Sequence, residues 1–243
     1  MATTGILTDL RLWVAVLIVG GMVYSVRAGK LTLPAALTGG LLGGLLYLGG
    51  GVTAVALLAL FFGLGSAASA WGLAEKQRLG LAEENKGRRR TGQVLANAGV
   101  AGLAGLGSWC WPPYAPVFQL VIAGSLAAAT ADTLSSELGN LYGRRYYNIL
   151  TLRPDRRGEN GVVSVAGTGL GVAGSLLVAL VAALGFDWGA EAAWLVLAAT
   201  AGNLTDSLLG ATLERRRMLS NNAVNGLTTL VGGLVAAAWR WIP

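Results

Sequence analysis

The stretch "APVFQLVIAGSLAAATADTLSSELGNLYGRR", residues 115–145, decides the fold class of this chain. It begins with a long uncharged apolar run, which as a helix is long enough to cross most of a hydrocarbon core of about 30 Å. Asp132 and Glu137 follow in the same run, just before Arg144 and Arg145. The stretch therefore predicts a membrane-spanning helix with two carboxylates near one end, a costly placement that needs a reason.

The composition of the whole chain supports a membrane protein. Of 243 residues, 54% are hydrophobic and 12% are charged, whereas about a quarter of a soluble domain is charged. We expect one integral membrane domain over residues 1–243, in which 37 glycines let helices approach closely. The chain has one cysteine and no histidine, which excludes a disulfide framework, a Cys/His zinc site and Ser-His or Cys-His catalysis.

Apolar runs of spanning length recur along the chain. The second and third runs meet at the three glycines 49–51, which predict a tight turn, and the fourth ends at Pro112-Pro113, which cannot continue a helix. The sequence predicts an all-α, polytopic membrane helical bundle of about eight transmembrane helices, at 10–27, 32–49, 51–71, 93–111, 114–139, 161–185, 191–212 and 223–242.

The distribution of charge agrees with this division. With eight spans, 16 of the 18 Lys and Arg residues fall in connections on one side, and only Arg11 and Arg240 lie opposite. The positive-inside rule makes the basic side cytoplasmic and places both termini on the non-cytoplasmic side. We expect a multi-pass protein whose active face is cytoplasmic, because its two long loops, 72–92 and 140–160, lie there.

Apart from Glu191 at the outer end of one span, three acidic residues lie inside the predicted spans: Asp132, Glu137 and Asp206. The aspartates share their context, "TADTLSSELG" and "TDSLLGATLE", so two helices are expected to bring them to one depth, where a divalent cation favours ionised carboxylates. Glu137 is about 140° from Asp132 on an ideal helix, so we expect it to meet a different neighbour unless the helix loosens. The alternative is that these carboxylates have no functional role and are solvated at a helix end or paired with nearby arginines.

Other polar residues are expected at the same level. Amides near helix starts can orient an anion, and basic residues can hold phosphates, although interhelical hydrogen bonds and contact with anionic lipid explain such residues equally well. The candidates for binding substrate or phosphate are Lys86, Arg88, Arg89, Asn97, Thr168, Asn203, Asn222 and Asn225.

Five segments, taken in order, carry a resemblance to a known family. They are "KGRRRTGQVLANAGV", "ADTLSSELG", "NGVVSVAGTGLG", "DSLLGATLE" and "NNAVN". In combination they resemble an integral membrane family, long a domain of unknown function, that includes the plant chloroplast phytyl-phosphate kinase. The resemblance runs from about Ser66 to the C-terminus. This chain departs from the family at Arg90 and Leu134, where an aromatic residue is usual, and at Glu214, where Gln is common.

The resemblance implies a prenyl-phosphate kinase that makes a diphosphate at the cytoplasmic membrane face. It implies Mg²⁺ on Asp132, Glu137 and Asp206, which are also the catalytic residues. The implied partners are an isoprenoid phosphate lipid, a nucleoside triphosphate, with CTP as one candidate, and membrane lipids, and no nucleic acid is implied. A transporter or lipid flippase that couples to a cation or proton through the same carboxylates is the main alternative, and a structural or assembly protein is a third.

Overall fold

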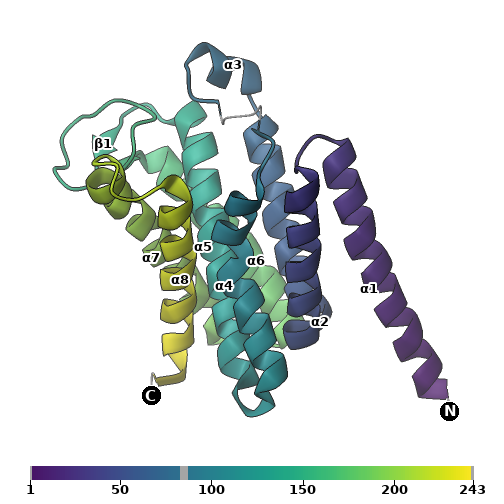
Figure 1. Ribbon diagram of the computed structural model, residues 1–243. Helices are drawn as coiled ribbons and strands as arrows, with labels where there is room; N and C mark the ends of the chain where they lie inside the picture. Colours follow the sequence, from purple (N-terminus) through teal and green to yellow (C-terminus); the bar gives the residue numbers. More distant parts are fainter. Residues whose placement is uncertain (1, 83–86, 242–243) are drawn as a thin grey trace.

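The computed structural model describes residues 2–82 and 87–241, with the side chains of residues 2–9 left aside (Figure 1). The described chain is a bundle of helices with one short β-hairpin at its end. In chain order the elements are α1 (Ala2–Arg27), α2 (Leu33–Ala70), α3 (Leu73–Arg78), α4 (Thr91–Cys110), η2 (Pro112–Tyr114), α5 (Ala115–Tyr142), β1 (Tyr147–Asn148), β2 (Val162–Val163), α6 (Val165–Phe186), α7 (Ala190–Leu209), η3 (Gly210–Glu214), α8 (Asn221–Ala237) and η4 (Ala238–Trp241).

Helix α2 consists of two helical halves that reverse direction at Gly51. This glycine has φ 63° and ψ −154°, outside the helical region, and a positive φ suits glycine because it has no Cβ. A Cβ built on Gly43 would lie 3.7 Å from Leu58 Cδ2, although the two residues would be roughly 22 Å apart on one straight helix. The halves therefore pack side by side, and the turn predicted at 49–51 is confirmed.

Five helical segments among the described residues are long and apolar enough to cross a membrane. They lie at Leu10–Arg27, Leu33–Ala70, Pro112–Tyr142, Val165–Phe186 and Ala190–Glu214. The second of them contains the reversal at Gly51. The all-α membrane bundle is confirmed, while the exact number of spans stays a prediction.

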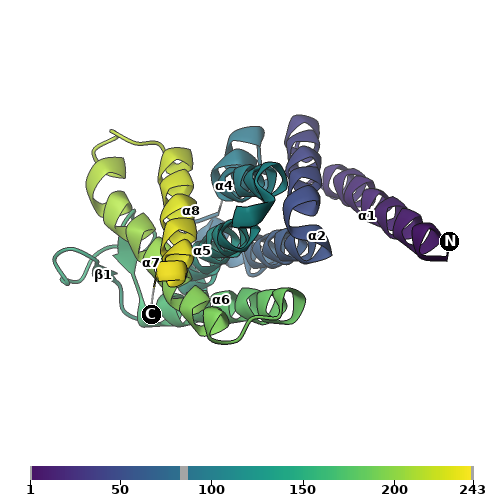
Figure 2. The ribbon, with the colours of Figure 1, turned by 90° about the horizontal axis from the view of Figure 1, so that it is seen from below.

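Helix α5 is the centre of the bundle. It packs against α2, α4, α6, α7 and α8, which surround it in Figure 2, whereas α1 lies at the edge and packs chiefly on α2. Small residues allow close contact: a Cβ built on Gly139 of α5 would lie 2.6 Å from Gly167 Cα of α6. The core is therefore made largely of alanine and glycine, as close helix packing in a membrane favours.

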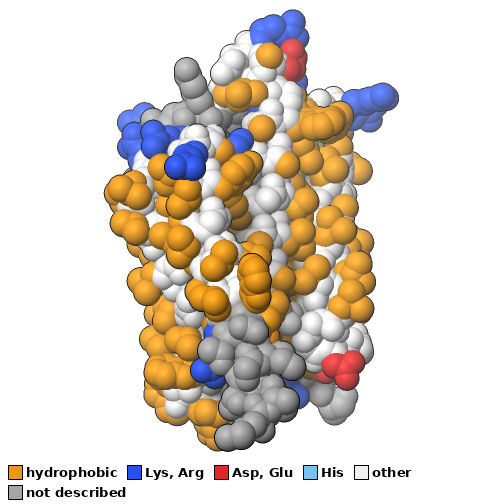
Figure 3. All heavy atoms as spheres, turned by 90° about the vertical axis from the view of Figure 1, so that its right-hand side faces the viewer, with side chains coloured by type: hydrophobic (Ala, Val, Ile, Leu, Met, Phe, Trp, Pro, Cys, Tyr) orange, Lys and Arg blue, Asp and Glu red, His pale blue; other side chains and the backbone are white. Residues whose placement is uncertain are grey.

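The basic connections gather at one end of the bundle. The α1–α2 turn, α3, the β-hairpin and the α7–α8 turn lie at the upper end in Figure 1, and the described ends of the chain lie at the lower end. Figure 3 shows a broad hydrophobic band on the face toward α1, with most of the visible Lys and Arg toward one end. The geometry agrees with the predicted segregation of charge, and which end faces the cytoplasm stays a prediction.

Candidate functional site

Two aspartates from different helices meet near the basic end of the bundle. The carboxyl groups of Asp132 on α5 and Asp206 on α7 are in hydrogen-bond contact, and Thr228 Oγ1 of α8 donates to Asp206 Oδ1 at 3.1 Å. The sequence predicted this meeting from the matching contexts of the two residues. Two carboxyl groups in contact repel each other when both are ionised, so they must share a proton or a cation.

Glu214 joins the aspartates, although it was not among the predicted site residues. It ends η3, a π-helical turn in which the Arg215 N–H bonds the Gly210 carbonyl at 3.2 Å. Its carboxylate interacts electrostatically with both aspartates and hydrogen bonds the side chain of Asn221. Such π-turns are frequent at functional sites because they rotate side chains away from ordinary helical positions. The sequence signal that could have indicated Glu214 is the motif "DSLLGATLE", of which it is the last residue.

The three carboxylates line a cavity of about 200 Å³ at the basic end of the bundle. Helices α4, α5, α7 and α8 form its walls, and the loop from Gly158 to Ser164 covers part of it. Seven of the predicted residues line this cavity: Arg89, Asn97, Asp132, Glu137, Asn203, Asp206 and Asn225. The structure thus brings together most of the residues that the sequence singled out.

Three predicted residues lie elsewhere. Arg88 is exposed, and its Nε donates to the Leu31 carbonyl at 3.3 Å. Asn222 is exposed beside Gly92 of α4, and Asn221 takes its expected place in the cavity wall.

Thr168 lies one turn into α6 and does not line the cavity; the residue from this region that does is Ser164, the N-cap of the helix. Asn222 misses the cavity because a one-residue change rotates a helical side chain by about 100°, and Thr168 misses it because it lies four residues, or about 6 Å, along α6 from Ser164. Lys86 lies outside the described residues.

Glu137 lines the same cavity but is not in the aspartate pair. Its Oε2 forms an ion pair with Lys76 of α3, and its Oε1 accepts a hydrogen bond from Ser69 at 3.1 Å. The Lys76 ammonium, only 1% exposed, also donates to the Ala68 carbonyl at 2.7 Å. The different neighbour that the 140° rotation predicted is therefore Lys76, and a metal role for Glu137 stays a prediction.

Arg89 is held in place through its backbone. Its N–H donates to the Lys30 carbonyl at 2.9 Å, and its own carbonyl accepts from the Thr32 N–H at 3.1 Å. The side chain is only 7% exposed, and the guanidinium lies 5.5 Å from the centre of the Phe61 ring. Among the described residues it forms no ion pair with a carboxylate. A buried, rigidly placed cation of this kind is suited to an anion.

The β-hairpin loop is fastened to η3 by a charged contact. Arg215 donates to Asp155 Oδ2 at 2.8 Å and to the Asn160 carbonyl at 2.6 Å. The hydrogen bond from Arg215, with further ones from the Arg156 N–H and the Asn148 side chain, lowers the pKa of Asp155 to about 2. The loop that covers the cavity is thus anchored to the element that carries Glu214.

The charges around the cavity favour a cation. Among the described residues the lining includes five carboxylates, from Asp132, Glu137, Glu159, Asp206 and Glu214, against the single basic side chain of Arg89. No three Asp, Glu or Cys side chains in residues 10–82 and 87–241 are grouped closely enough to hold a metal by themselves. A site with two carboxylates fits Mg²⁺, which usually takes one or two carboxylates and completes its coordination with water and substrate phosphates.

Comparison with known proteins places the chain in a family. The family profile described as "Integral membrane protein DUF92" matches residues 15–233. An uncharacterised membrane protein of the archaeon Methanocaldococcus jannaschii is 33% identical over 238 residues, which cover 94% of each chain. No solved structure matches this chain.

Two photosynthetic organisms contain further relatives. An uncharacterised membrane protein of Synechocystis is 36% identical over 186 residues, covering 74% of this chain and 70% of the relative. The Arabidopsis thaliana protein "VTE6, chloroplastic" is 32% identical over 203 residues, covering 81% of this chain and 61% of the relative. This chain therefore belongs to the integral membrane family DUF92, the family that the five sequence segments indicated.

Proposed function

We propose that this protein is a prenyl-phosphate kinase. It transfers a phosphoryl group from a nucleoside triphosphate to an isoprenoid monophosphate at the cytoplasmic membrane face. The observation that carries the proposal is the contact between Asp132 and Asp206 inside a polar cavity that Arg89 also lines. Membership of the family that includes the chloroplast phytyl-phosphate kinase supports the same reaction.

The proposed reaction needs no histidine. A phosphate monoester has a second pKa of roughly 6, so its attacking oxygen is already mostly ionised at neutral pH. That oxygen bonds to the γ-phosphorus of the donor while the bond from this phosphorus to the β–γ bridging oxygen breaks. The products are an isoprenoid diphosphate and a nucleoside diphosphate. Phosphoryl transfer of this kind depends mainly on positioning and charge neutralisation, which carboxylates, amides and arginine provide.

The carboxylates explain how an acidic cavity could accept phosphates. Mg²⁺ held by Asp132 and Asp206 would neutralise charge on the transferred group. Thr228 orients Asp206 through its hydrogen bond, and Asn221 does the same for Glu214. Arg89 offers a fixed positive group to one phosphate. Asn97, Asn203 and Asn225 offer amides at the same level.

A transporter would need polar groups that continue toward the other end of the bundle. The buried residues of α5 on the far side of Asp132 are alanine, leucine, isoleucine and glycine, together with Ser125 and Thr130. The Thr130 hydroxyl is satisfied within its own helix by the Leu126 carbonyl at 2.7 Å. The polar lining is thus concentrated at one end, which supports chemistry at an interface over passage across the bundle.

The test is a transfer assay on purified protein in lipid nanodiscs. Phytyl or geranylgeranyl monophosphate is incubated with CTP or ATP, with and without Mg²⁺, and the diphosphate is measured by mass spectrometry. We expect Asp132→Asn and Asp206→Asn each to reduce turnover about 100-fold or more, since each removes a charge that stabilises the transition state.

Asp187→Asn is the matched control. Asp187 lies between α6 and α7, at the opposite end of the bundle, with φ 57°, a conformation that Asn tolerates. It should leave turnover unchanged. Near-normal turnover in both cavity variants would refute the metal assignment. Flux is measured separately, with the purified protein reconstituted in sealed lipid vesicles. Movement of the substrate across the vesicle membrane without nucleotide hydrolysis would refute the kinase in favour of a transporter.

A further inference from the structure

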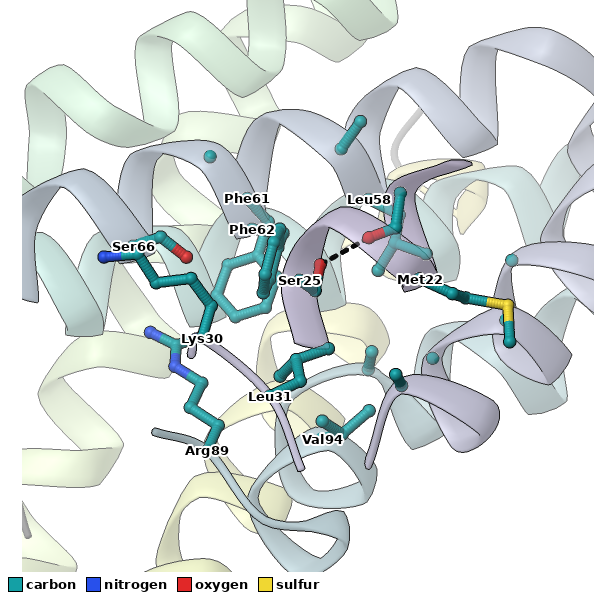
Figure 4. Close-up of a pocket in the computed structure, with 18 of the residues that line it drawn as sticks. Met22, Ser25, Lys30, Leu31, Leu58, Phe61, Phe62, Ser66, Arg89 and Val94 are labelled. Carbon is teal, nitrogen blue, oxygen red and sulfur yellow. Dashed lines mark hydrogen bonds between the residues drawn. The ribbon is translucent and has the colours of Figure 1, made fainter. Parts of the chain in front are cut away.

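A second, larger cavity lies beside the polar one. It has a volume of about 470 Å³ and is lined by α1, both halves of α2 and the start of α4 (Figure 4). Apolar side chains such as Met22, Leu58, Phe62 and Val94 form most of its wall. On the second half of α2 its lining runs from Val55 to Ala70, a length of roughly 22 Å along the helix. The space is long and apolar, as a hydrocarbon chain requires.

The two cavities share a wall. Arg89, Gln93 and Asn97 line both of them. Gln93 and Asn97 lie on one face of α4, and Arg89 lies just before the start of this helix. Figure 4 shows Arg89 and Lys30 at the same end of the apolar cavity, beside Ser66 and Phe61. An apolar space that ends at two basic groups, next to a polar cavity, matches a lipid that carries a phosphate at one end.

Glycines leave room along the apolar cavity. A Cβ built on Gly21, Gly39 or Gly63 would meet nothing within 4 Å, although all three residues line the space. Helix α1, which forms the outer wall, lies at the edge of the bundle and packs chiefly on α2. The cavity therefore has room for a branched chain, and its outer wall faces the surrounding lipid.

We propose that this cavity binds the hydrocarbon tail of a long-chain isoprenoid monophosphate that enters from the bilayer between α1 and α2. Arg89 and Lys30 hold the phosphate at the shared wall. Gln93 and Asn97 then separate it from the polar cavity, where Asp132 and Asp206 lie. This assignment rests on the proposed function for the identity of the lipid, while the cavity, its basic end and the shared wall are independent of it.

The test is photolabelling of the full chain in nanodiscs, without nucleotide. The probe is geranylgeranyl monophosphate with a diazirine in its tail, and labelled residues are located by mass spectrometry. We expect labels on α1, α2 and the start of α4. Geranylgeranyl monophosphate should compete about tenfold better than geranylgeraniol or inorganic phosphate, because it alone uses both the apolar wall and the basic end. Labels elsewhere, or equal competition by the alcohol or by inorganic phosphate, would overturn the proposal.

A pair of matched variants tests the depth of the cavity. Gly39→Leu places a side chain in the cavity, about 9 Å along α2 from Leu33, the first residue of this helix. It should weaken binding of geranylgeranyl monophosphate at least about tenfold and of the shorter geranyl monophosphate much less. Gly44→Leu is the control, because Gly44 lies in the same helix with nothing within 4 Å of its Cβ and does not line the cavity. Equal behaviour of the two variants would overturn the proposal.

Variants of Arg89 separate the contribution of charge at the basic end from that of the apolar wall to lipid binding. Arg89→Gln should abolish the advantage of the monophosphate over the alcohol, and Arg89→Lys should restore part of it. If neither variant changes that advantage, the basic end is not the phosphate site. Transfer is measured separately. Specific labelling of this cavity without any phosphoryl transfer would refute the kinase and support the lipid site. Phosphoryl transfer that Gly39→Leu leaves unchanged would support the kinase and refute the lipid site.

Discussion

Replacement of Lys76 by Met is expected to destabilise the protein strongly, because it leaves the Glu137 carboxylate buried without a counter-ion. Lys76 is 1% exposed and Glu137 is 8% exposed. Lys76 also bonds the Ala68 carbonyl near the end of α2, and Glu137 bonds Ser69. The ion pair thus fastens α3 to the ends of α2 and α5, beside the polar cavity.

The expected magnitude follows from burial. Two unit charges about 4 Å apart attract by roughly 4 kcal/mol at an effective dielectric constant of about 20. Loss of one partner of a buried pair costs roughly 3–5 kcal/mol, because the other charge remains uncompensated, whereas replacing both partners costs much less. We therefore expect Lys76→Met to lose about 3–5 kcal/mol and the double variant Lys76→Met/Glu137→Gln to lose less than half of that.

Helix α3 also offers a matched control. Arg78 and Glu75 form an ion pair with side chains that are 75% and 43% exposed, and such surface pairs contribute little to stability because water screens them. Arg78→Met should therefore have a small effect. The assay is thermal unfolding of the purified variants in one detergent, followed by the transfer assay at a temperature where all of them are folded.

Two results would contradict this reasoning. One is a Lys76→Met variant that melts at the same temperature as Arg78→Met. The other is a double variant that is no more stable than Lys76→Met alone. The activity of the folded double variant decides the role of Glu137: retained activity shows that Glu137 acts only through its contact with Lys76, whereas a metal-binding Glu137 predicts a folded but inactive protein.

Two further predictions concern the hairpin and the close helix contact. Ionised Asp155, with its pKa lowered to about 2, should stabilise the contact with Arg215 above about pH 4 and lose this effect as the pH falls toward 2. Hydrogen exchange of the hairpin amides should show this loss, and Asp155→Asn should remove the pH dependence. Gly139→Ala should lower the melting temperature, because its Cβ would lie 2.6 Å from Gly167 Cα. Gly169→Ala, with nothing within 4 Å, should not; equal effects would contradict the packing argument.

The pairing of Asp132 with Asp206 could be predicted because it depends on depth. The order of apolar runs and charged loops places each aspartate near the basic end of its helix. Charged side chains at membrane depth face the interior of the bundle, so two of them at one depth are expected to meet there. Glu214 was missed because it lies two residues beyond the expected end of its span, at 212. The π-turn that directs it toward the aspartates is a local departure from helical geometry that the sequence pattern does not reveal.

By itself, the sequence determined the membrane class, the turn at Gly51 and the gathering of basic residues at one end, because apolar length, glycine and charge act locally. Only the tertiary structure decided that Glu137 pairs with Lys76 and that Arg89 stands between a polar and an apolar cavity. Those outcomes depend on the rotation of each helix about its axis and on contacts between segments far apart in the chain. The helix rotations and these long-range contacts are determined together by the close packing of the whole bundle.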